Sequence, residues 1–431
     1  MISKLKKISL GNWMLIGMVL GFLVGLILNF YVTNPVIKDI ILIDNVFYLG
    51  GTGFIKLMKM LVVPLVFFSI VVGVASISDI RKIGSIGGRT IGIYLITTAL
   101  AVTIAILIAS FIKPGIGLNM VGLAQANVTS NVTVTDTILN MIPDNPFNSL
   151  ANGDMLPVII FGVLVGIILA TLKNETNVVN DFFTQGNTVM MEMTRIVMKF
   201  APIGIFCLMA KTFASLGFGG LIPLAKYISC VLIGLAIQAL IIYPSLLILF
   251  TRLNPIKFFK KFVSVMFFAF SSSTSNATIP LNLEKLSELG VSREISSFTI
   301  PLGATINMDG TAIMQGCAVM FAAQAYGIDL GITALLTVIF TAVMASIGTA
   351  GVPSVGLITL NMVFGSVGLP VDAIGIIMGI DHLLDMFRTA VNVTGDAICT
   401  IIVSFKNKAI DIDMFNGKKA PEETWDDITR F

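Results

Sequence analysis

Long apolar segments recur along this chain and limit its fold more strongly than any other feature. Six of them extend over residues 12–33, 47–77, 90–112, 155–172, 188–216 and 225–251. About 20 consecutive apolar residues span a bilayer as a helix, and in lipid only helices and closed barrels satisfy every backbone polar group. Charged residues make up 12% of the 431 residues, against about 25% in soluble domains. The sequence therefore predicts an all-α integral membrane protein.

The second half of the chain contains apolar segments that polar residues interrupt. An apolar run at 262–270, too short to cross a bilayer, meets SSSTSNATIP (271–280), and the segment 331–366 is broken by ASIGTAGVPSVG. We expect each to form a re-entrant helical hairpin, the first with its tip at 271–280. Full spans follow at 295–326 and 371–405, so eight transmembrane helices plus two hairpins are predicted. Broken helices of this kind are typical of the binding sites of secondary transporters.

Lysine and arginine clusters predict the orientation of these spans. Lys4, Lys6 and Lys7 precede the first span, and further clusters lie at 81–89, 252–261 and 406–419. With eight spans and two hairpins, all of them fall on one side, and an excess of Lys and Arg marks cytoplasmic loops. Both termini are therefore expected in the cytoplasm of a multi-pass plasma-membrane protein. Residues 406–431 are expected to form a solvated, partly disordered tail.

One apolar segment contains the charged sequence GIDHLLDMFRTAVNVTGD (379–396). At about 100° per residue, Asp381, Asp385, Arg388, Asn392 and Asp396 lie within roughly an 80° sector of a helix. Charged side chains are costly at the bilayer centre and usually face protein or an aqueous cavity. Because this face has three acids and one base, bound cations would balance it with oxygen ligands. An ion-pair network that holds helices together is the structural alternative.

A further intramembrane acid, Asp309, lies in TINMDGTA (305–312). Gly310 and the polar neighbours predict a locally unwound helix, and such backbone is tolerated in a membrane only inside protein or along a cavity. A polar kink is the alternative. Together, the acids, the freed carbonyl groups and one guanidinium suit a cation and an anionic organic solute bound side by side.

Several function classes are disfavoured. The net charge of +3 is small and dispersed, so nucleic acid is not an expected partner. The four cysteines, Cys207, Cys230, Cys317 and Cys399, lie too far apart for a disulfide framework or a metal site. The serine run 271–275 has no base near it in sequence, so neither an enzyme nor an organic cofactor is expected. The one histidine, His382, is expected to be a packed or interfacial residue.

Three motifs together resemble the dicarboxylate/amino acid:cation symporter family, which includes the excitatory amino acid transporters and their prokaryotic sodium–aspartate and sodium–glutamate relatives. They are NMDGT (307–311), SIGTAGVP (346–353) and DMFRTAVNVTGD (385–396). Residues 60–77 and 199–210 are similar to the second and fifth helices of the family. The resemblance implies a homotrimer in membrane lipid, with inverted repeats and an elevator mechanism in which the second hairpin is the gate.

The resemblance also implies a division of the chain. Scaffold helices 1–2 would occupy residues 1–80, and scaffold helices 4–5 residues 114–220. The transport domain would contain helix 3 at 81–113 and a core at 221–405, formed by helix 6, hairpin 1, helix 7, hairpin 2 and helix 8. The cytoplasmic tail would begin at residue 406.

The same resemblance assigns binding positions. Arg388 matches the arginine that binds the side-chain carboxylate of the substrate, which a bidentate guanidinium–carboxylate pair explains physically, and Asp385 matches the residue that receives the substrate ammonium group. The other implied substrate positions are Thr274, Ser275, Met308, Thr311, Val352, Gly356, Thr389 and Asn392. The implied Na⁺ positions form three sets: Gly303, Asn307, Asn392 and Asp396; Tyr94, Thr97, Thr98, Asn307 and Asp309; and Thr305, Ser346, Ile347 and Thr349.

Two features bear on the coupling ion and the substrate. Asp396, where proton-coupled relatives tend to carry a neutral residue, favours Na⁺. Ser273 and Met386 stand where the family places a second arginine, so potassium coupling is not expected. The leading hypothesis is Na⁺-coupled uptake of aspartate or glutamate. The alternatives are a Na⁺-coupled transporter of neutral amino acids or cystine, a C4-dicarboxylate transporter, which would leave Asp385 facing a carboxylate, and an ion channel.

Overall fold

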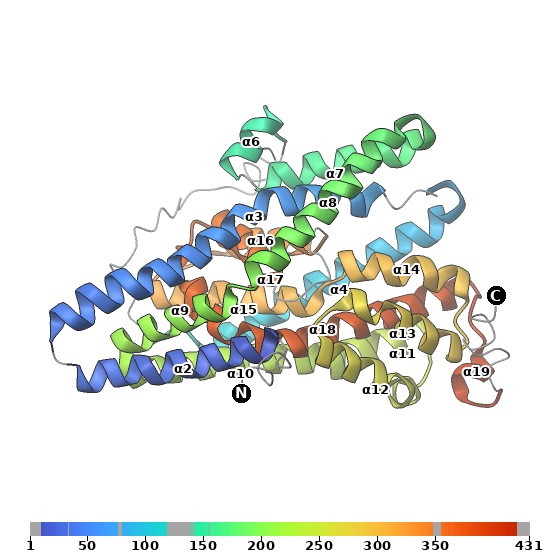
Figure 1. Ribbon diagram of the computed structural model, residues 1–431. Coiled ribbons are helices and arrows are strands. Elements are labelled where there is room, and N and C mark those ends of the chain that lie inside the picture. The colour runs from blue at the N-terminus through green and yellow to red at the C-terminus, as the bar shows by residue number, and fades with distance from the viewer. Residues whose placement is uncertain are drawn as a thin grey trace, which may run out of the picture.

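The computed structural model of the protein describes residues 10–32, 34–75, 80–118, 139, 142–153, 155–347 and 355–419. Within these residues the chain is helical, and most helices run side by side in one elongated bundle (Figure 1). Its elements are α2 (Leu10–Tyr31), the π-helix η1 (Val36–Phe47), α3 (Tyr48–Ala75), α4 (Ile80–Ile112), α6 (Pro146–Asn152), α7 (Met155–Leu172), the 3-10 turn η2 (Lys173–Thr176), α8 (Asn177–Met198), α9 (Ala201–Leu216), the 3-10 turn η3 (Gly217–Gly220), α10 (Leu221–Ile237), the π-helix η4 (Gln238–Ile242), α11 (Tyr243–Thr251), α12 (Pro255–Ser272), α13 (Ser275–Glu288), α14 (Arg293–Ile306), α15 (Asp309–Tyr326), α16 (Ile332–Ile347), α17 (Val355–Ser366), α18 (Asp372–Lys406) and α19 (Ile412–Asn416).

Several of these helices have the length and composition of membrane spans. Among the described residues, Ile86–Ile112, Leu221–Thr251 and Ala373–Lys406 are each long and apolar enough to cross a bilayer. The helices α8 and α9 are together long and apolar enough to cross a bilayer, with a bend of 51° between them. The predicted span 188–216 is therefore part of a bent pair that begins earlier, at Asn177. The all-helical class is confirmed, whereas the count of eight transmembrane helices stays a prediction.

A glycine stripe on α2 lets this helix lie close against α9. Gly17, Gly21 and Gly25 recur every fourth residue, and all three face the backbone of α9. A Cβ atom built at Gly25 would lie 2.7 Å from the carbonyl oxygen of Ala210 and 2.8 Å from the Cβ of Phe213. Small residues at this spacing allow the backbones of membrane helices to approach closely. The close packing of α2 against α9 therefore depends on the lack of side chains at these three glycines.

The other helices gather into two groups that α18 joins. The helix α3 contacts α7, α8 and α9, whereas α4 contacts α10, α15 and α16. The helix α18 contacts α2 and α9 from the first group and α4, α10 and α12–α15 from the second. The two groups resemble the predicted scaffold and transport domain. The division into these domains stays a prediction.

The first interrupted segment is a hairpin of α12 and α13 with a tighter turn than expected. The helix α12 ends at Ser272, Ser273 adopts a left-handed conformation with φ 50°, and Thr274 occupies the N-cap position of α13. The predicted tip at 271–280 is therefore wrong for residues 275–280, which are already helical. Short polar residues are favoured at helix N-termini, so this polar run begins a helix instead of extending a loop.

The two other breaks occur between α14 and α15 and between α16 and α17. The first is confined to Asn307 and Met308, which is narrower than the interruption expected at 305–312. The helices α16 and α17 are the arms of the second predicted hairpin. Its tip, at residues 348–354, lies outside the described residues, and with it the predicted positions Thr349 and Val352.

The residues that follow α18 pack against the bundle. Phe415 of α19 is fully buried, and the Lys261 ammonium donates to the Met414 carbonyl at 2.9 Å. The backbone N–H of Asp411 also donates to the Gly290 carbonyl at 2.8 Å, next to the turn that links α13 and α14. The expectation of a solvated, partly disordered tail is therefore wrong for the segment around Phe415, because one buried aromatic ring and backbone pairing hold it in place, whereas residues 417–419 are exposed.

Gly25→Ala is expected to destabilise the protein, because the new methyl group would overlap the carbonyl of Ala210. Gly92→Ala in α4 is the matched control, since no atom lies within 4 Å of a Cβ built there. Alanine is about 1 kcal/mol better than glycine inside a helix, so this control should keep or raise stability. Thermal unfolding in detergent would measure both midpoints, and equal midpoints would contradict the close packing of α2 on α9.

Candidate functional site

The charged face of α18 lies buried among the broken helices. Asp381, Asp385, Arg388, Asn392 and Asp396 each expose 6% or less of their surface. The helix α18 contacts α12, α13, α14, α15 and α17, so it runs past the ends of all three interrupted segments (Figure 1). The helical spacing predicted one protected face, and the structure places all five side chains inside protein.

Arg388 bridges two carboxylates of its own helix. Its Nη1 donates to Asp381 Oδ1 at 2.5 Å, and its Nη2 donates to Asp385 Oδ1 at 2.7 Å. The two acids precede Arg388 by seven and three residues, so they lie about two turns and one turn away on the same face. Breaking a buried ion pair by removing one partner costs about 3–5 kcal/mol. Pairing therefore keeps the guanidinium charged here, and it gives Asp381 a role that the sequence alone left open.

Two other elements bring predicted substrate positions to the guanidinium. A Cβ atom built at Gly356 of α17 would lie 3.7 Å from Arg388 Nη2 and 2.9 Å from Thr311 Cγ2 of α15. The Thr311 hydroxyl lies 4.0 Å from the sulfur of Met308, which immediately precedes α15. Thr311, Gly356 and Arg388 thus meet at one point, and the lack of a side chain at residue 356 allows the approach.

Thr389 and Asn392 make different kinds of contact. The Thr389 hydroxyl donates to the Asp385 carbonyl at 2.8 Å, inside α18. The Asn392 Oδ1 accepts the backbone N–H of Gly310 at 2.7 Å. Because the first N–H groups of a helix have no partner within it, Asn392 satisfies the start of α15 and ties it to α18.

The turn of the first hairpin packs against α18. Phe270, near the end of α12, packs edge-on against Phe387 of α18, with 4.9 Å between the ring centroids. Thr274 and Ser275 follow at the start of α13, and Ser275 is buried. The structure therefore places the predicted hairpin positions at the turn beside α18.

Asp309 forms the centre of a second polar cluster, fully buried. Thr98 donates to its Oδ1 at 2.7 Å, and Thr97 lies 3.4 Å from the same oxygen. Its Oδ2 accepts hydrogen bonds from Gln238 at 3.0 Å and from Tyr243 at 2.8 Å. Gln238 and Tyr243 are not among the positions predicted from the sequence. An isolated glutamine in an otherwise apolar span was the available signal, since polar residues inside membrane helices tend to be functional.

Asn307 joins this cluster to Asp396. Its Nδ2 donates to Asp396 Oδ1 at 2.9 Å, and its Oδ1 accepts from Thr97 at 3.2 Å. Gly303 faces the same carboxylate, and a Cβ atom built there would lie 2.8 Å from the Tyr94 hydroxyl. That hydroxyl donates to the Thr299 carbonyl at 2.9 Å. The first two predicted Na⁺ sets therefore form one continuous network of oxygen and amide groups.

The third predicted set is only partly described. The Ser346 hydroxyl donates to the Ile306 carbonyl at 3.0 Å, which joins the end of α16 to the end of α14. The Thr305 hydroxyl donates to the Leu302 carbonyl at 2.9 Å within α14. Ile347 is the last residue of α16. These residues surround the break between α14 and α15, where helix ends leave carbonyl groups free of intrahelical bonds.

The charge balance of the buried region favours a bound cation. In the part of the chain that the structure describes, the buried charged residues are four aspartates and one arginine. No three His, Cys, Asp or Glu side chains gather there closely enough to hold a metal ion. A cation would therefore take carboxylate, amide, hydroxyl and carbonyl oxygens, which suits a hard ion.

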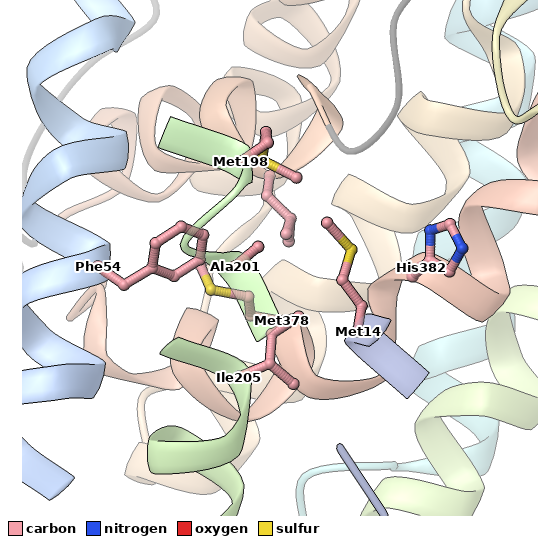
Figure 2. Close-up of a pocket in the computed structure, with 8 residues that line it drawn as sticks. Met14, Phe54, Met198, Ala201, Ile205, Met378 and His382 are labelled. Carbon is pink, nitrogen blue, oxygen red and sulfur yellow. The ribbon is translucent and has the colours of Figure 1, made fainter. Parts of the chain in front are cut away.

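His382 lies apart from this network, on another side of α18. It lines a cavity of about 10 Å³, together with Met14, Phe54, Ile205 and Met378. Figure 2 shows His382 at one side of this cavity and Phe54 at the other, with the Met14 side chain between them. The histidine thus packs where α18 meets α2, α3 and α9, as expected for an interfacial residue.

Comparisons of sequence relate this chain to known proteins. A sequence model described as the "Sodium:dicarboxylate symporter family" matches residues 10–405. The "Proton/sodium-glutamate symport protein" of Geobacillus stearothermophilus is 36% identical, over 93% of this chain and 95% of that protein. The "Proton/glutamate-aspartate symporter" of Escherichia coli (strain K12) is 34% identical, over 92% and 93%.

A third relative carries a different substrate in its name. The "C4-dicarboxylate transport protein" of Cupriavidus necator is 32% identical, over 84% of this chain and 85% of that protein. All of these matches cover most of both chains. The chain therefore belongs to the sodium:dicarboxylate symporter family.

Proposed function

We propose that this protein is a secondary symporter that takes up aspartate or glutamate together with Na⁺. The observation that carries the proposal is the buried guanidinium of Arg388, paired with Asp381 and Asp385 beside the polar network of Asp309 and Asp396. An isolated buried pair would need only one acid. The names of the Geobacillus and Escherichia relatives, which contain glutamate and aspartate, support the same substrate class.

The substrate would bind where α15, α17 and α18 meet. Arg388 would bind the side-chain carboxylate of the substrate, since a guanidinium matches a carboxylate bidentately. Asp385 would receive the ammonium group, and Thr311, Thr389 and Asn392 would supply further polar contacts. The remaining substrate positions of this proposal are Thr274, Ser275, Met308, Val352 and Gly356.

Sodium ions would bind at the three sets of oxygen ligands predicted from the sequence. The Asp309 and Asp396 clusters support the first two sets, because each combines a buried carboxylate with amide or hydroxyl groups. Bound Na⁺ would offset the excess of acids, and an anionic substrate would then find a less negative site. Coupling of this kind is reciprocal, so the substrate should also raise the affinity for Na⁺.

The proposal includes an assembly and a movement. Three copies would form a homotrimer in the plasma membrane with both termini in the cytoplasm, and residues 1–80 and 114–220 would form the scaffold. Residues 81–113 and 221–405 would move across the membrane as the transport domain. The grouping of helix contacts supports this division, because α4 lies against α10, α15 and α16 although it follows α3 in the chain.

A C4-dicarboxylate is the second candidate substrate, favoured by the Cupriavidus relative. Such a substrate has the two carboxylates of aspartate but a hydrogen or a hydroxyl group in place of the ammonium group. Asp385 would then lose its cationic partner on the substrate and lie near substrate carboxylates of like charge, which costs binding free energy in a buried site. Neutral amino acids and cystine are weaker candidates, because they do not use the charge of Arg388.

An inward Na⁺ gradient should drive labelled aspartate into proteoliposomes against its own gradient. Replacing external Na⁺ with choline should abolish accumulation, and a proton gradient alone should not restore it. Downhill flux without accumulation would instead indicate a channel. If succinate accumulated and aspartate did not, the C4-dicarboxylate hypothesis would be favoured.

Arg388→Gln should weaken aspartate binding by roughly 100-fold, because truncating one partner of a buried charge pair costs about 2–5 kcal/mol. The single variant removes the guanidinium from both Asp381 and Asp385, so the double variant Asp381→Asn/Arg388→Gln, which also removes the charge of Asp381, is expected to fold better and is the preferred test. Arg195→Gln is the matched control, since Arg195 is exposed and forms its ion pair with the exposed Glu192. Isothermal titration in Na⁺ would measure all three, and unchanged aspartate affinity in the double variant would refute the assigned role.

Gln238→Leu should weaken the apparent affinity for Na⁺ by about 10-fold or more, since partners that orient a metal ligand typically contribute 10–100-fold. The variant removes the amide that holds Asp309 Oδ2. Gln324→Leu is the control, because Gln324 also makes hydrogen bonds inside the bundle, to the backbone of Gly115 and Ala109, but lies at the far end of α15. The measurement is the Na⁺ dependence of aspartate uptake. An equal effect of the two variants would show a general loss of stability instead.

A further inference from the structure

A groove on the outer surface of the bundle lies at the corner between α11 and α12. It has a volume of about 600 Å³ and is lined by Leu240, Pro244, Ile248, Arg252, Ile256 and Phe259. In Figure 1 this corner lies near α19, at the end of the bundle that holds the C-terminus. None of these residues takes part in the site around Arg388.

The floor of the groove is an exposed apolar stripe. Leu240, Ile248 and Ile256 expose 68%, 52% and 76% of their surface. Along the continuous helix Leu221–Thr251, the twelve residue-to-residue steps from Leu240 to Arg252 cover about 18 Å at 1.5 Å each. One leaflet contributes about 15 Å to the hydrocarbon core. The stripe is therefore long enough for one acyl chain, and its Arg252 end reaches the headgroup level.

The rim of the groove is basic and lacks nearby acids. No Asp or Glu occurs between residues 193 and 283, whereas Arg252, Lys257, Lys260 and Lys261 follow one another at the corner. Lys257 and Lys261 donate to groups of Asn416 and Met414 in α19. Within the described residues, Arg252 and Lys260 have no acidic side chain within ion-pair distance. These two exposed cations are thus available to an external anion.

The backbone fixes Arg252 at the mouth of the groove. Arg252 adopts a left-handed conformation with φ 58°, and its N–H donates to the Ile248 carbonyl at 2.9 Å. The side chain of Asn254 then accepts the N–H of Ile256 and begins α12. The corner is therefore a defined turn, and it holds a guanidinium directly above an apolar floor.

We propose that this groove binds one anionic phospholipid, with an acyl chain along Leu240, Pro244 and Ile248 and its phosphate at Arg252 and Lys260. A guanidinium binds a phosphate bidentately, and basic pockets beside membrane helices on the cytoplasmic side select anionic headgroups. A zwitterionic lipid would bring its own cation into this basic corner and bind less well. The inference rests on the membrane placement proposed above, but not on the transported substrate.

Native mass spectrometry of the purified full chain tests this, with phosphatidylglycerol and phosphatidylcholine as the probes. The wild type should retain phosphatidylglycerol preferentially. Arg252→Gln should reduce that retention by about fivefold, the contribution expected of one basic residue near a membrane surface. Ile248→Trp, which fills the groove without changing its charge, should reduce it as well.

Two matched controls are available in the same chain. Lys113 is also basic and exposed, with a left-handed φ of 53° directly after a spanning helix, so Lys113→Gln should leave retention unchanged. Ile233→Trp places the same bulk on the same helix outside the groove. Equal retention of both lipids by the wild type, or full retention by Arg252→Gln, would overturn the proposal. Cross-linking of Ile256→Cys between copies in phosphatidylcholine would overturn it too, because a second copy would then occupy the groove.

Discussion

The burial of Arg388 is the interaction on which the rest of the binding region depends. A guanidinium inside a membrane protein needs carboxylate partners, and both partners come from the same helix, at Asp381 and Asp385. That arrangement requires α18 to stay helical through the whole region, and it does so for 35 residues. The segments packed around it are instead interrupted. One unbroken helix thus holds the charges while its neighbours supply helix ends.

Those helix ends are useful because they release backbone groups that must find partners inside the protein. The N–H of Gly310 is satisfied by Asn392, and the Ile306 carbonyl accepts the Ser346 hydroxyl. Each contact joins elements that lie far apart in the sequence. In a membrane no water replaces a lost partner, so the breaks are stable only while α14, α15, α16 and α18 remain together.

The sequence predicted the features that depend on local spacing or on contiguous motifs. The shared face of Asp381, Asp385 and Arg388 follows from helical periodicity, and three motifs indicated the family. The partners of Asp309 were predicted only in part, because Gln238 and Tyr243 lie about seventy residues before it and carry no motif. The docking of α19 was missed for a similar reason, since the burial of Phe415 depends on the surface that α12 presents.

On the proposed function, the double pairing of Arg388 changes the energetics of substrate binding. A substrate carboxylate that takes the place of Asp385 exchanges one buried ion pair for another, and Asp385 would pair with the substrate ammonium group instead of with Arg388. Asp381, less exposed than Asp385 at 1% against 6%, keeps Nη1 throughout. The number of unpaired charges does not rise, so the desolvation cost of burying ions stays small. The exchange leaves Asp309 and Asp396 without a cationic partner, and Na⁺ bound at these carboxylates would make the ion a thermodynamic partner of the substrate.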